Sequence, residues 1–501
     1  MTNTNEQNDT STPRPPVVGI FGHIDHGKSS LLDYIRKSNV VEKEAGGITQ
    51  HISAYEITHE HEGKSSQITF LDTPGHVAFS GIRTRGASVA DIAVLVVSGE
   101  DGVKPQTLEV YKHIQKSSLP FVVAITKIDK PEASLDRTKS SLAEAGIYVE
   151  GFGGTVPVVG ISSKTGKGVP ELLDMILLLS DLNELKGDRD ALGSGVIIES
   201  KLDPKRGITA TALIKNGTVR KSTFAATPGS MAVLRYILDA ESKQVEELSF
   251  SSPIQITGWD KMPKSGSEFK TFLKKDEALA YAKTEQTTDN RQPTREMGEG
   301  MIILPLIIKA DTAGSLEAVE NEIGKLSRER IVPKVTSSGV GAINENDVKG
   351  AVTTPGTVLL ALHAKTENAA GALALRSGIN IESFDLIYEL VERVGKLLEE
   401  REPRIEVEEV LGNAKVIRIF SIDKSKQVIG ARVLSGKFAV GANLKIIRRE
   451  SEIGRGRLRE LQQAKVKTSE VAEGSEFGAM VESKVEIAIG DTLEATIIVT
   501  K

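Results

Sequence analysis

The sequence predicts a protein built from several α/β and β domains. Its 501 residues are enough for about three to four domains of ordinary size. Strand and helix patterns alternate over residues 16–181 and again over 301–382, as in parallel sheets covered by helices. Elsewhere, short alternating runs separated by turn residues favour antiparallel barrels. The expected class is therefore α/β and β multidomain: a doubly wound α/β domain, a β-barrel, an α/β/α domain, a long connecting helix and a C-terminal β-barrel.

The domain boundaries follow from changes in periodicity and polarity. The polar, Thr- and Asn-rich start has no apolar core for a signal peptide, so we expect a disordered tail there. A polar, charged stretch before residue 300 is expected to be a linker. The expected segments are 1–15 (tail), 16–181 (first α/β domain), 182–285 (β-barrel), 286–300 (linker), 301–382 (second α/β domain), 383–403 (connecting helix) and 404–501 (C-terminal barrel).

The composition excludes several classes of protein. Hydrophobic residues make up 39% of the chain and charged residues 26%, and no apolar run approaches the ~20 residues that span a bilayer. There is no cysteine, which excludes disulfides, thiolate catalysis and zinc–thiolate sites. The net charge of −5 gives no global nucleic-acid signature. We expect a cytoplasmic monomer without a membrane partner.

The most informative stretch fits the pattern G-x-x-x-x-G-K-[ST] of phosphate-binding loops. An expected strand over 17–21 precedes it and an expected helix over 30–36 follows it, which is the context that the pattern needs. Glycines let backbone N–H groups surround phosphate oxygens, the lysine places its charge on the β- and γ-phosphates, and the serine hydroxyl is a Mg²⁺ ligand. An ordinary glycine-rich turn is the alternative. The residues are Gly22, His23, Ile24, Asp25, His26, Gly27, Lys28 and Ser29.

A second motif follows the expected strand 68–71. A carboxylate that ends a strand beside a phosphate loop holds Mg²⁺, which is the role expected of Asp72. Gly75 lets a backbone N–H approach the γ-phosphate, and His76 is placed to orient the attacking water. A simple strand-ending turn is the alternative. The motif comprises Asp72, Thr73, Pro74, Gly75 and His76.

A glycine pair and a hydroxyl lie between these two motifs. Gly46-Gly47 precedes Thr49, and this combination suits a switch segment that closes on Mg²⁺ and the γ-phosphate through the Thr49 hydroxyl. On its own this signal is weak.

Two further groups follow later expected strands, 121–125 and 156–160. After the first, a carboxylate at Asp129 accepts hydrogen bonds from N1–H and the 2-amino group of guanine, a pair that adenine does not offer, and Lys127 lies along the base. The second group closes over the base. The residues are Thr126, Lys127, Ile128, Asp129, Ser162, Ser163 and Lys164.

Together these motifs resemble the guanine-nucleotide-binding domain of the translational GTPases. The stretches 44–52 and 101–107 are similar to bacterial translation initiation factor two, in a short form that lacks the long N-terminal extension. The resemblance implies a GTPase with GTP or GDP and Mg²⁺ as ligands. It implies that Ser29, Thr49 and Asp72 contact the metal, that His76 is the catalytic residue and that Asp129 selects guanine.

One position in the base-binding motif departs from this family. The family has asparagine where this chain has Thr126. Threonine keeps one hydroxyl and loses the second arm of the amide, so base anchoring is expected to weaken by about 1 kcal/mol. Selenocysteine-specific elongation factors resemble this chain in having threonine there, so the change does not exclude GTP binding.

The middle of the chain also resembles initiation factor two. Residues 207–220 are similar to the barrel that follows the nucleotide domain, and residues 309–318 to the family's next α/β domain. Trp259 is expected to pack at the barrel edge rather than to stack on a base. Asp311 is expected to serve a turn and helix cap, because no second acid or base lies nearby in the motif.

The connecting helix carries one apolar stripe between residues 386 and 398, and Ser383 or Asp385 is its candidate cap. Two roles remain open for it. It is a rigid spacer between domains, or it packs against a neighbouring domain.

The last barrel carries a local surplus of positive charge. Residues 404–470 contain 15 lysine and arginine residues against 8 acidic ones, a surplus of seven in a chain that is −5 overall. Such a surface suits RNA phosphates, although charge runs also occur on faces that simply meet solvent. The resemblance implies that this barrel holds the acceptor end of formylmethionyl initiator tRNA.

Three segments depart from the family's pocket for the formylmethionyl group. The family has cysteines where this chain has Ala431 and Phe477, and a basic and aromatic pair where it has Gln463-Ala464. Glu476 and Gly478 are retained. We expect a smaller and more apolar pocket, in which Phe477 fills space or packs on the methionine side chain. Recognition of the formyl group therefore stays open.

The resemblance implies a translation initiation factor. Its expected role is GTP-dependent delivery or stabilisation of initiator tRNA on the small ribosomal subunit, followed by joining of the large subunit and ribosome-stimulated GTP hydrolysis. The expected partners are both ribosomal subunits and initiator tRNA. One alternative is a specialised translational GTPase of the elongation type, which Thr126 and the altered last barrel favour. The other is a GTP-independent ribosome- or tRNA-binding protein, which the intact motifs disfavour.

Overall fold

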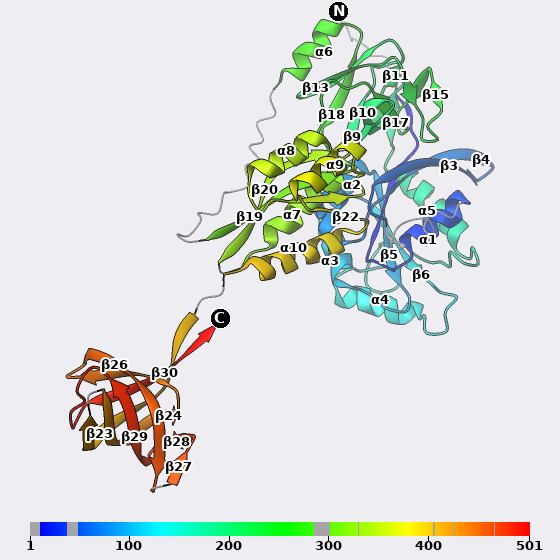
Figure 1. Cartoon of the computed structure of the whole chain (residues 1–501). Helices are drawn as coiled ribbons and strands as arrows, with labels where there is room; N and C mark the ends of the chain where they lie inside the picture. The colour runs from blue at the N-terminus through cyan, green and yellow to red at the C-terminus, as the bar shows by residue number, and fades with distance from the viewer. Residues whose placement is uncertain are drawn as a thin grey trace, which may run out of the picture. The chain divides into compact units, whose positions relative to one another are not determined.

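The computed structural model describes residues 11–37, 49–284, 301–328, 330–403, 406–423, 425–464 and 466–500. The chain divides into two compact units, Met1–Arg401 and Glu402–Lys501, and each is described by itself (Figure 1). No helix in these described ranges is long and apolar enough to cross a membrane. The expected linker, 286–300, lies outside the described residues.

The first domain is a six-stranded sheet in which only the edge strand β3 runs antiparallel to its neighbour. Residues 17–22, 92–98 and 121–126 are buried almost throughout because helices cover both faces of the sheet. The sheet order is β3 (Ser53–His61), β4 (Lys64–Asp72), β2 (Val17–Gly22), β5 (Ile92–Ser98), β6 (Phe121–Thr126) and β7 (Val158–Gly160).

Helices flank this sheet as a doubly wound fold requires. The helices that contribute to the core of one face are α1 (Lys28–Arg36) and α5 (Val169–Leu182). The helices that contribute to the core of the other face are α2 (Ser80–Val89), α3 (Pro105–Lys116) and α4 (Leu135–Glu144). A short helix, η3 (Val77–Phe79), precedes α2. The carboxyl ends of β2, β4, β6 and β7 therefore meet along one edge, and all the predicted nucleotide motifs begin there.

The second domain is an antiparallel barrel. Strand β13 does not pair with β15 at the far end of the order, but a bridge between Ala232 and Trp259 joins β13 to the residues just after β17. The sheet order is β13 (Ser230–Val233), β12 (Phe224–Thr227), β18 (Glu268–Phe272), β9 (Ser194–Asp203), β10 (Gly207–Asn216), β17 (Pro253–Thr257), β14 (Ile237–Leu238) and β15 (Gln244–Val245). A separate pair is β11 (Thr218–Arg220) with β16 (Glu247–Ser249), and α6 (Lys275–Ala282) packs on β12.

Two predictions about this barrel can be compared with the structure. Trp259 is 4% exposed in the barrel core, where its indole N–H donates to the Ile256 carbonyl at 3.1 Å, so its packing role is confirmed. The alternating run over 231–238 predicts one strand from the sequence, and this prediction is wrong, because the chain breaks between β13 and β14 where the Arg235 N–H turns back to the Val233 carbonyl.

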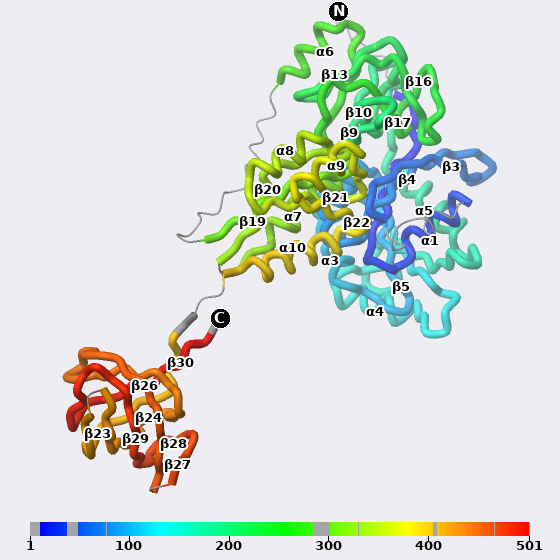
Figure 2. The backbone as a smooth tube through the Cα atoms, in the orientation of Figure 1, coloured from blue at the N-terminus to red at the C-terminus, as the bar shows by residue number. Residues whose placement is uncertain are grey.

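The third domain is a parallel four-stranded sheet between two helical layers (Figure 2). The sheet order is β20 (Ile331–Val340), β19 (Ile302–Ala310), β21 (Val358–Leu362) and β22 (Ile381–Phe384). One face is covered by α7 (Ala313–Lys325) and α10 (Ile387–Arg401), and the other by α8 (Glu345–Thr353) and α9 (Asn368–Ser377).

Helix α10 resolves the question left open for the connecting helix. Its apolar stripe, including Leu390, Val394 and Leu397, is buried with α7 and the sheet in one core. It therefore packs against the third domain along its length and ends at Arg401, where the first unit ends. Ser383 belongs to β22 and is not its cap.

The C-terminal unit is a closed barrel. Strand β23 pairs with both β30 and β24, which closes the sheet. The order around it is β23 (Glu406–Asp423), β30 (Thr492–Thr500), β25 (Asn443–Arg448), β26 (Ser451–Gln463), β29 (Glu476–Ser483) and β24 (Lys426–Ala439), with β27 (Val466–Thr468) and β28 (Glu470–Ala472) attached at its margin.

The expected disordered tail is wrong for its last residues. Strand β1 (Ser11–Pro13) pairs with β8 (Lys186–Asp188). The Arg14 guanidinium then donates to both oxygens of the Asp91 carboxylate at 2.6 and 2.7 Å. Lys215 of the barrel donates to the same carboxylate at 2.8 Å, so this buried network joins the start of the chain, the first domain and the second. Residues 1–10 lie outside the described part of the chain.

Candidate functional site

The phosphate loop connects β2 to α1, and its glycines are required by close contacts. A side chain at Gly22 would place its Cβ 2.4 Å from the Val96 carbonyl oxygen. Gly27 has φ +85°, a left-handed conformation that few other residues adopt, just before the first residue of α1. The backbone N–H groups at the start of α1 thus lie at the edge of the sheet, where an anion is favoured.

Lys28 is buried inside this loop. Its ammonium donates to the His23 carbonyl at 2.6 Å, and burial lowers its pKa to about 8. The ammonium also leaves little room for a side chain at position 75, because a Cβ at Gly75 would lie 2.6 Å from Lys28 Nζ. Burial removes the water that would stabilise the charged ammonium, so an anion bound beside Lys28 stabilises its charged form.

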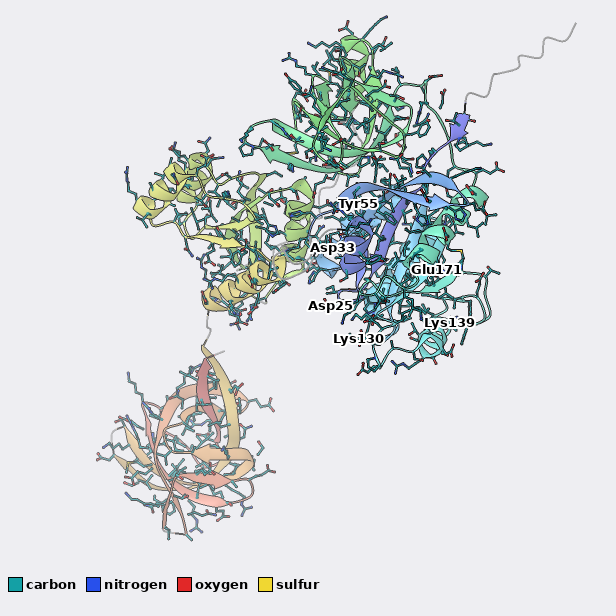
Figure 3. All side chains as sticks on the ribbon, turned by 90° about the vertical axis from the view of Figure 1, so that its right-hand side faces the viewer. Asp25, Asp33, Tyr55, Lys130, Lys139 and Glu171 are labelled. Atoms are coloured by element: carbon teal, nitrogen blue, oxygen red, sulfur yellow. The ribbon has the colours of Figure 1, made fainter. Side chains whose placement is uncertain are left out.

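The predicted motifs converge on one cavity of about 360 Å³. Residues from the phosphate loop, from Thr49, from the turn after β4 and from the loops after β6 and β7 all line it. Figure 3 labels two of these residues, Asp25 and Lys130, which lie near each other at this edge. The lining residues are Ile24, Asp25, Gly27, Lys28, Ser29, Ser30, Thr49, Gly75, His76, Thr126, Lys127, Asp129, Lys130, Ser163 and Lys164.

Three oxygen-bearing side chains meet beside Lys28. The hydroxyls of Ser29 and Thr49 are 2.9 Å apart, and the Thr49 hydroxyl donates to Asp72 Oδ2 at 3.5 Å. Two hydroxyls and a buried carboxylate form the kind of donor set that hard cations prefer. The residues expected to hold Mg²⁺ therefore fit that ion. Gly46 and Gly47 lie outside the described residues.

His76 is held in one orientation by its own turn. The Ala78 N–H donates to His76 Nδ1 at 3.2 Å, so in the neutral ring Nε2 carries the hydrogen. Burial lowers the His76 pKa below its ordinary value, an effect that Glu322 opposes and Arg83 reinforces, and this favours the neutral ring. The imidazole lies 6.5 Å from the Tyr388 ring of α10, measured between ring centres. In this orientation Nε2 can donate to a water molecule but cannot accept its proton.

Sequence reasoning missed Arg83, which fixes the turn that carries His76. This side chain on α2 is 1% exposed. It donates to the Pro74 carbonyl at 3.3 Å and to the His76 carbonyl, and it pairs with Glu109 of α3 at 2.7 Å. An arginine in an amphipathic helix is ordinary, so no local signal in the sequence pointed to it.

Thr126 makes a contact that the sequence did not predict. Its buried hydroxyl donates to the His26 carbonyl at 2.6 Å, which ties the base-binding loop to the phosphate loop. Its donor is thus used within the protein rather than kept for a base. Asp129 accepts from the Ser162 hydroxyl at 2.7 Å, and this hydrogen bond lowers the pKa of the carboxyl. Asp129 is thus ionised at pH 7 at the rim of the cavity.

The other predicted residues support the cavity rather than line it. The His26 imidazole points inward, where Nδ1 accepts from the Ser98 N–H at 3.3 Å and burial lowers its pKa to about 4. The Thr73 hydroxyl donates to the Ile20 carbonyl at 2.7 Å, while Ile128 packs in the adjoining core. The predicted residues outside the lining are Gly22, His23, His26, Asp72, Thr73, Pro74, Ile128 and Ser162.

A second cavity, of about 680 Å³, lies in the C-terminal barrel at the segments predicted to form a pocket. Ala431 and Phe477 are register partners on β24 and β29, and both line it with Gly430 and Gly478. Phe477 is 4% exposed and its ring lies 5.3 Å from that of Phe438, so it fills the barrel core. Gln463 was expected to form part of this pocket, but its neighbours Gln462 and Ala464 line the cavity instead.

The positive surplus of this barrel is smaller on its surface than in the sequence window. Lys445, Arg448 and Arg459 each pair with a carboxylate that lies beyond residue 470 in the chain. Arg432 pairs in the same way with Glu476. These acidic partners lie on β29, on β30 and in the turn before β30. They are distant in the sequence from the basic residues, so the sequence window did not include them.

The predicted cap role of Asp311 is wrong. Thr312 caps α7, where its hydroxyl accepts from the Ser315 N–H at 3.2 Å. Asp311 faces two histidines instead, with Oδ2 3.3 Å from His51 Nε2 and Oδ1 3.9 Å from His363 Nδ1. The partners lie 260 and 52 residues away in the sequence, so the motif around Asp311 gave no sign of them.

Comparison with known proteins matches the domains in the order in which the structure presents them. The sequence profile of the elongation factor Tu GTP-binding domain matches residues 14–181. That of elongation factor G domain 2 matches residues 193–272, and that of translation-initiation factor 2 matches residues 279–395.

Three curated relatives match almost the whole chain. Translation initiation factor IF-2 of Nitratiruptor sp. is 40% identical over 98% of this chain, that of Chlorobaculum parvum 39% over 100%, and that of Bartonella quintana 38% over 96%. Over almost its whole length the chain is therefore similar to translation initiation factor IF-2 proteins. It spans 59%, 55% and 58%, respectively, of the lengths of these IF-2 relatives.

Two solved structures match parts of this chain or most of it with low structural similarity. GDP-bound aIF5B from Aeropyrum pernix is 25% identical, with a TM-score of 0.48 over 97% of this chain and 92% of its own. A bacterial selenocysteine-specific elongation factor, EF-Sec, is 18% identical with a TM-score of 0.42 over 51% of this chain and 45% of its own.

Proposed function

We propose that this chain is a GTPase of translation initiation that acts on the ribosome with initiator tRNA. The observation that carries the proposal is the single cavity on which four separated motifs and Thr49 converge. The residues of this site supply a cation that binds phosphates and a cluster of oxygen atoms that suits a metal ion. They also supply a carboxylate that binds the nucleotide base and a histidine that orients water. Similarity to IF-2 proteins supports translation initiation as the process in which this activity is used.

In the proposed reaction, water attacks the γ-phosphorus of GTP, the bond to the β–γ bridging oxygen breaks, and GDP and phosphate leave. Lys28 moves its hydrogen bond from the His23 carbonyl to the β- and γ-phosphate oxygens and stabilises the charge that develops there. The N–H groups at the start of α1 stabilise the same charge. Gly75 keeps the space beside Lys28 open for the γ-phosphate.

A magnesium ion is held, in this proposal, by Ser29, Thr49 and Asp72. When bound, such an ion neutralises charge between the β- and γ-phosphates. The Thr49 hydroxyl contacts both Ser29 and Asp72, so all three side chains would be in place to hold such an ion. We infer that the segment around Thr49 changes position with the phosphate content of the nucleotide.

Guanine selection by Asp129 is tested by exchange of its carboxylate for an amide. Asp129→Asn turns one acceptor into a donor, so the variant is expected to prefer XTP to GTP. Binding of GTP and XTP is measured by calorimetry on the nucleotide-free protein. Asp136→Asn, on α4, is the matched control and is expected to keep the preference for GTP. An unchanged ratio of GTP to XTP affinity in Asp129→Asn would refute this assignment.

The role of His76 is tested by hydrolysis with and without ribosomes. Because His76 donates from Nε2 and its pKa is lowered, we propose that it positions water and does not act as a base. His76→Ala is expected to bind GTP normally and to lose ribosome-stimulated hydrolysis, whereas the control His113→Ala on α3 keeps both. Normal turnover by His76→Ala would show that another group orients the water.

The C-terminal barrel is proposed to hold the acceptor end of initiator tRNA at the cavity that Phe477 and Ala431 line. The test is binding of the full chain to formylated and unformylated methionyl initiator tRNA at several salt concentrations. A preference for the formylated form supports a pocket for that group, rebuilt from different residues. Equal and salt-sensitive binding would mean that the barrel contacts only the tRNA backbone. Binding to neither form would contradict the proposed partner.

A further inference from the structure

We propose that His51, Asp311 and His363 form a binding site for a divalent transition-metal ion, of which Zn²⁺ is the best fit, at the junction of the first and third domains. Their ligand atoms lie within 4.8 Å of one another, and they are the only such group among the described residues. This site is separate from the proposed magnesium site, and it does not depend on the proposed function.

The topology explains why two of the ligands come together. Strands β19 and β21 are parallel neighbours, and their last residues, Ala310 and Leu362, are register partners. Asp311 and His363 are the next residues of the two strands, so both side chains stand at the carboxyl edge of the sheet, where α/β folds bind ligands. The first domain brings His51 to this edge from the residues just before β3.

Distances within the group are those of a site that needs little adjustment. Ligand atoms bonded to zinc at about 2.0–2.2 Å in a tetrahedron lie about 3.3–3.6 Å from one another. His51 Nε2 is 3.3 Å from Asp311 Oδ2, and His363 Nδ1 is 3.9 Å from Asp311 Oδ1. Small side-chain rotations are enough to bring all three atoms to coordination distance.

A backbone hydrogen bond fixes His363 as a ligand. His363 Nε2 is 2.6 Å from the Asp385 carbonyl oxygen, which can only accept, so Nε2 carries the hydrogen. In the neutral ring the lone pair is therefore on Nδ1, which faces Asp311. Metal-bound histidines usually donate their second ring N–H in this way. His363 also has φ +52°, a strained backbone conformation of the kind that clusters at ligand sites.

Two buried polar atoms then face each other without a hydrogen bond. Asp311 Oδ1 and His363 Nδ1 are both buried and have no hydrogen-bond partner among the described residues. A carboxylate lone pair opposite an imidazole lone pair is unfavourable, and a cation between them removes the conflict. Protonation of both histidines would also supply charge, but it would put two positive rings 5.3 Å apart, measured between their centres.

The chemistry of the donors selects the metal class. Two imidazole nitrogens and one carboxylate suit zinc and other late divalent metals, and three protein ligands leave a position for water. The side chains of His51, Asp311 and His363 are 37%, 29% and 18% exposed, so an ion can reach them from solvent. Because His51 lies two residues after Thr49, a bound ion would fasten the end of that segment to the third domain.

The test is metal binding by the full, nucleotide-free chain. After removal of metal with a chelator, Zn²⁺ is titrated by calorimetry, and Co²⁺ is used as a probe whose visible absorption reports nitrogen and oxygen ligands in a low-coordinate site. We expect one site per chain. His363→Asn and Asp311→Asn are expected to weaken it at least 100-fold. Asparagine tolerates a positive φ, so His363→Asn keeps the backbone, which circular dichroism checks.

A second histidine pair supplies the matched control. His59 and His61 both contact Asp174 Oδ1, at 2.9 and 2.8 Å, and both side chains are half-buried. His59→Gln is therefore expected to leave the zinc site intact. The proposal is overturned if no stoichiometric Zn²⁺ or Co²⁺ binding occurs, if binding survives in His363→Asn and Asp311→Asn, or if His59→Gln abolishes it.

Discussion

Replacement of Thr126 by valine tests the buried hydrogen bond that joins the base-binding loop to the phosphate loop. Valine has the shape of threonine but cannot donate to the His26 carbonyl, which the Thr126 hydroxyl reaches at 2.6 Å. A neutral hydrogen bond contributes about 0.5–1.5 kcal/mol, and a buried carbonyl left without a partner costs about 1–3 kcal/mol. We therefore expect the free energy of unfolding of the first domain to fall by about 1–3 kcal/mol.

The same loss sets a limit on the change in nucleotide affinity. If the whole free energy were needed to hold the two loops together for binding, the Kd for GDP would rise by about 5- to 150-fold, because each 1.4 kcal/mol is a factor of ten. Scanning calorimetry measures the first quantity and titration with GDP the second.

Two control variants separate the hydrogen bond from general damage. Thr126→Ser keeps the hydroxyl and should behave like the wild type. Thr138→Val removes another buried hydroxyl, one that bonds to the Ser134 carbonyl at 2.9 Å outside the cavity. It should lower stability and leave GDP binding unchanged. If Thr126→Val unfolds and binds GDP like the wild type, the contact with His26 contributes nothing and the reasoning is wrong.

Two further predictions concern buried carboxylates with opposite pKa shifts. Asp91→Asn should lower the free energy of unfolding by about 3–5 kcal/mol at pH 7, because Arg14 and Lys215 would remain buried without their counter-charge. Burial by itself would raise the Asp91 pKa, but these two cations hold it below its ordinary value. The wild type should therefore lose this stability only as the pH falls below about 4, and equal stability of the two proteins in calorimetry at pH 7 would contradict the prediction. Burial raises the Glu199 pKa to about 7, against 4.5 for an exposed glutamate. The folded state binds an extra proton between these values, so stability should fall as the pH rises from about 4.5 to 7. Glu199→Gln should be as stable as the wild type near pH 4.5 and about 3 kcal/mol more stable at pH 8, and a thermal melting curve that tracks the wild type at both pH values would refute this. The charged groups that act on Glu199 are Asp311, Lys201 and Arg85.

The sequence was most informative where chemistry and periodicity coincide. Phosphate-loop residues such as Lys28 lie between a buried strand and an amphipathic helix, so pattern and motif supported each other. The barrel of the second domain was recognisable from its turns. Strands β12 and β18 were not predicted, because β12 has only four residues and β18 is a short run that mixes polar and apolar residues. Strand β3 was missed for a similar reason, since half of its residues are charged or histidine.

Features that depend on distant partners could not be predicted from local patterns. Arg83 gave no signal because its partners lie on two other segments of the first domain, the turn after β4 and α3. Asp311 was assigned to a helix cap because the neighbouring sequence fits one, but the cap is the next residue, Thr312. His363 became its partner only through the register of two parallel strands. Such pairs require the register of the sheet, which composition and spacing do not supply.

The network around Asp91 has a consequence for the order in which the chain folds during synthesis. Asp91 is followed by Lys215 only 124 residues later. At synthesis rates of about 5–20 residues per second, this separation corresponds to about 6–25 s. The first domain is complete only at Leu182, where α5 ends, so for the last 33 residues of that interval the newly made domain must neutralise Asp91 with Arg14 alone, on a face that the barrel has not yet covered. The nascent domain therefore reaches its full resistance to unfolding only when the second domain has been made and has docked.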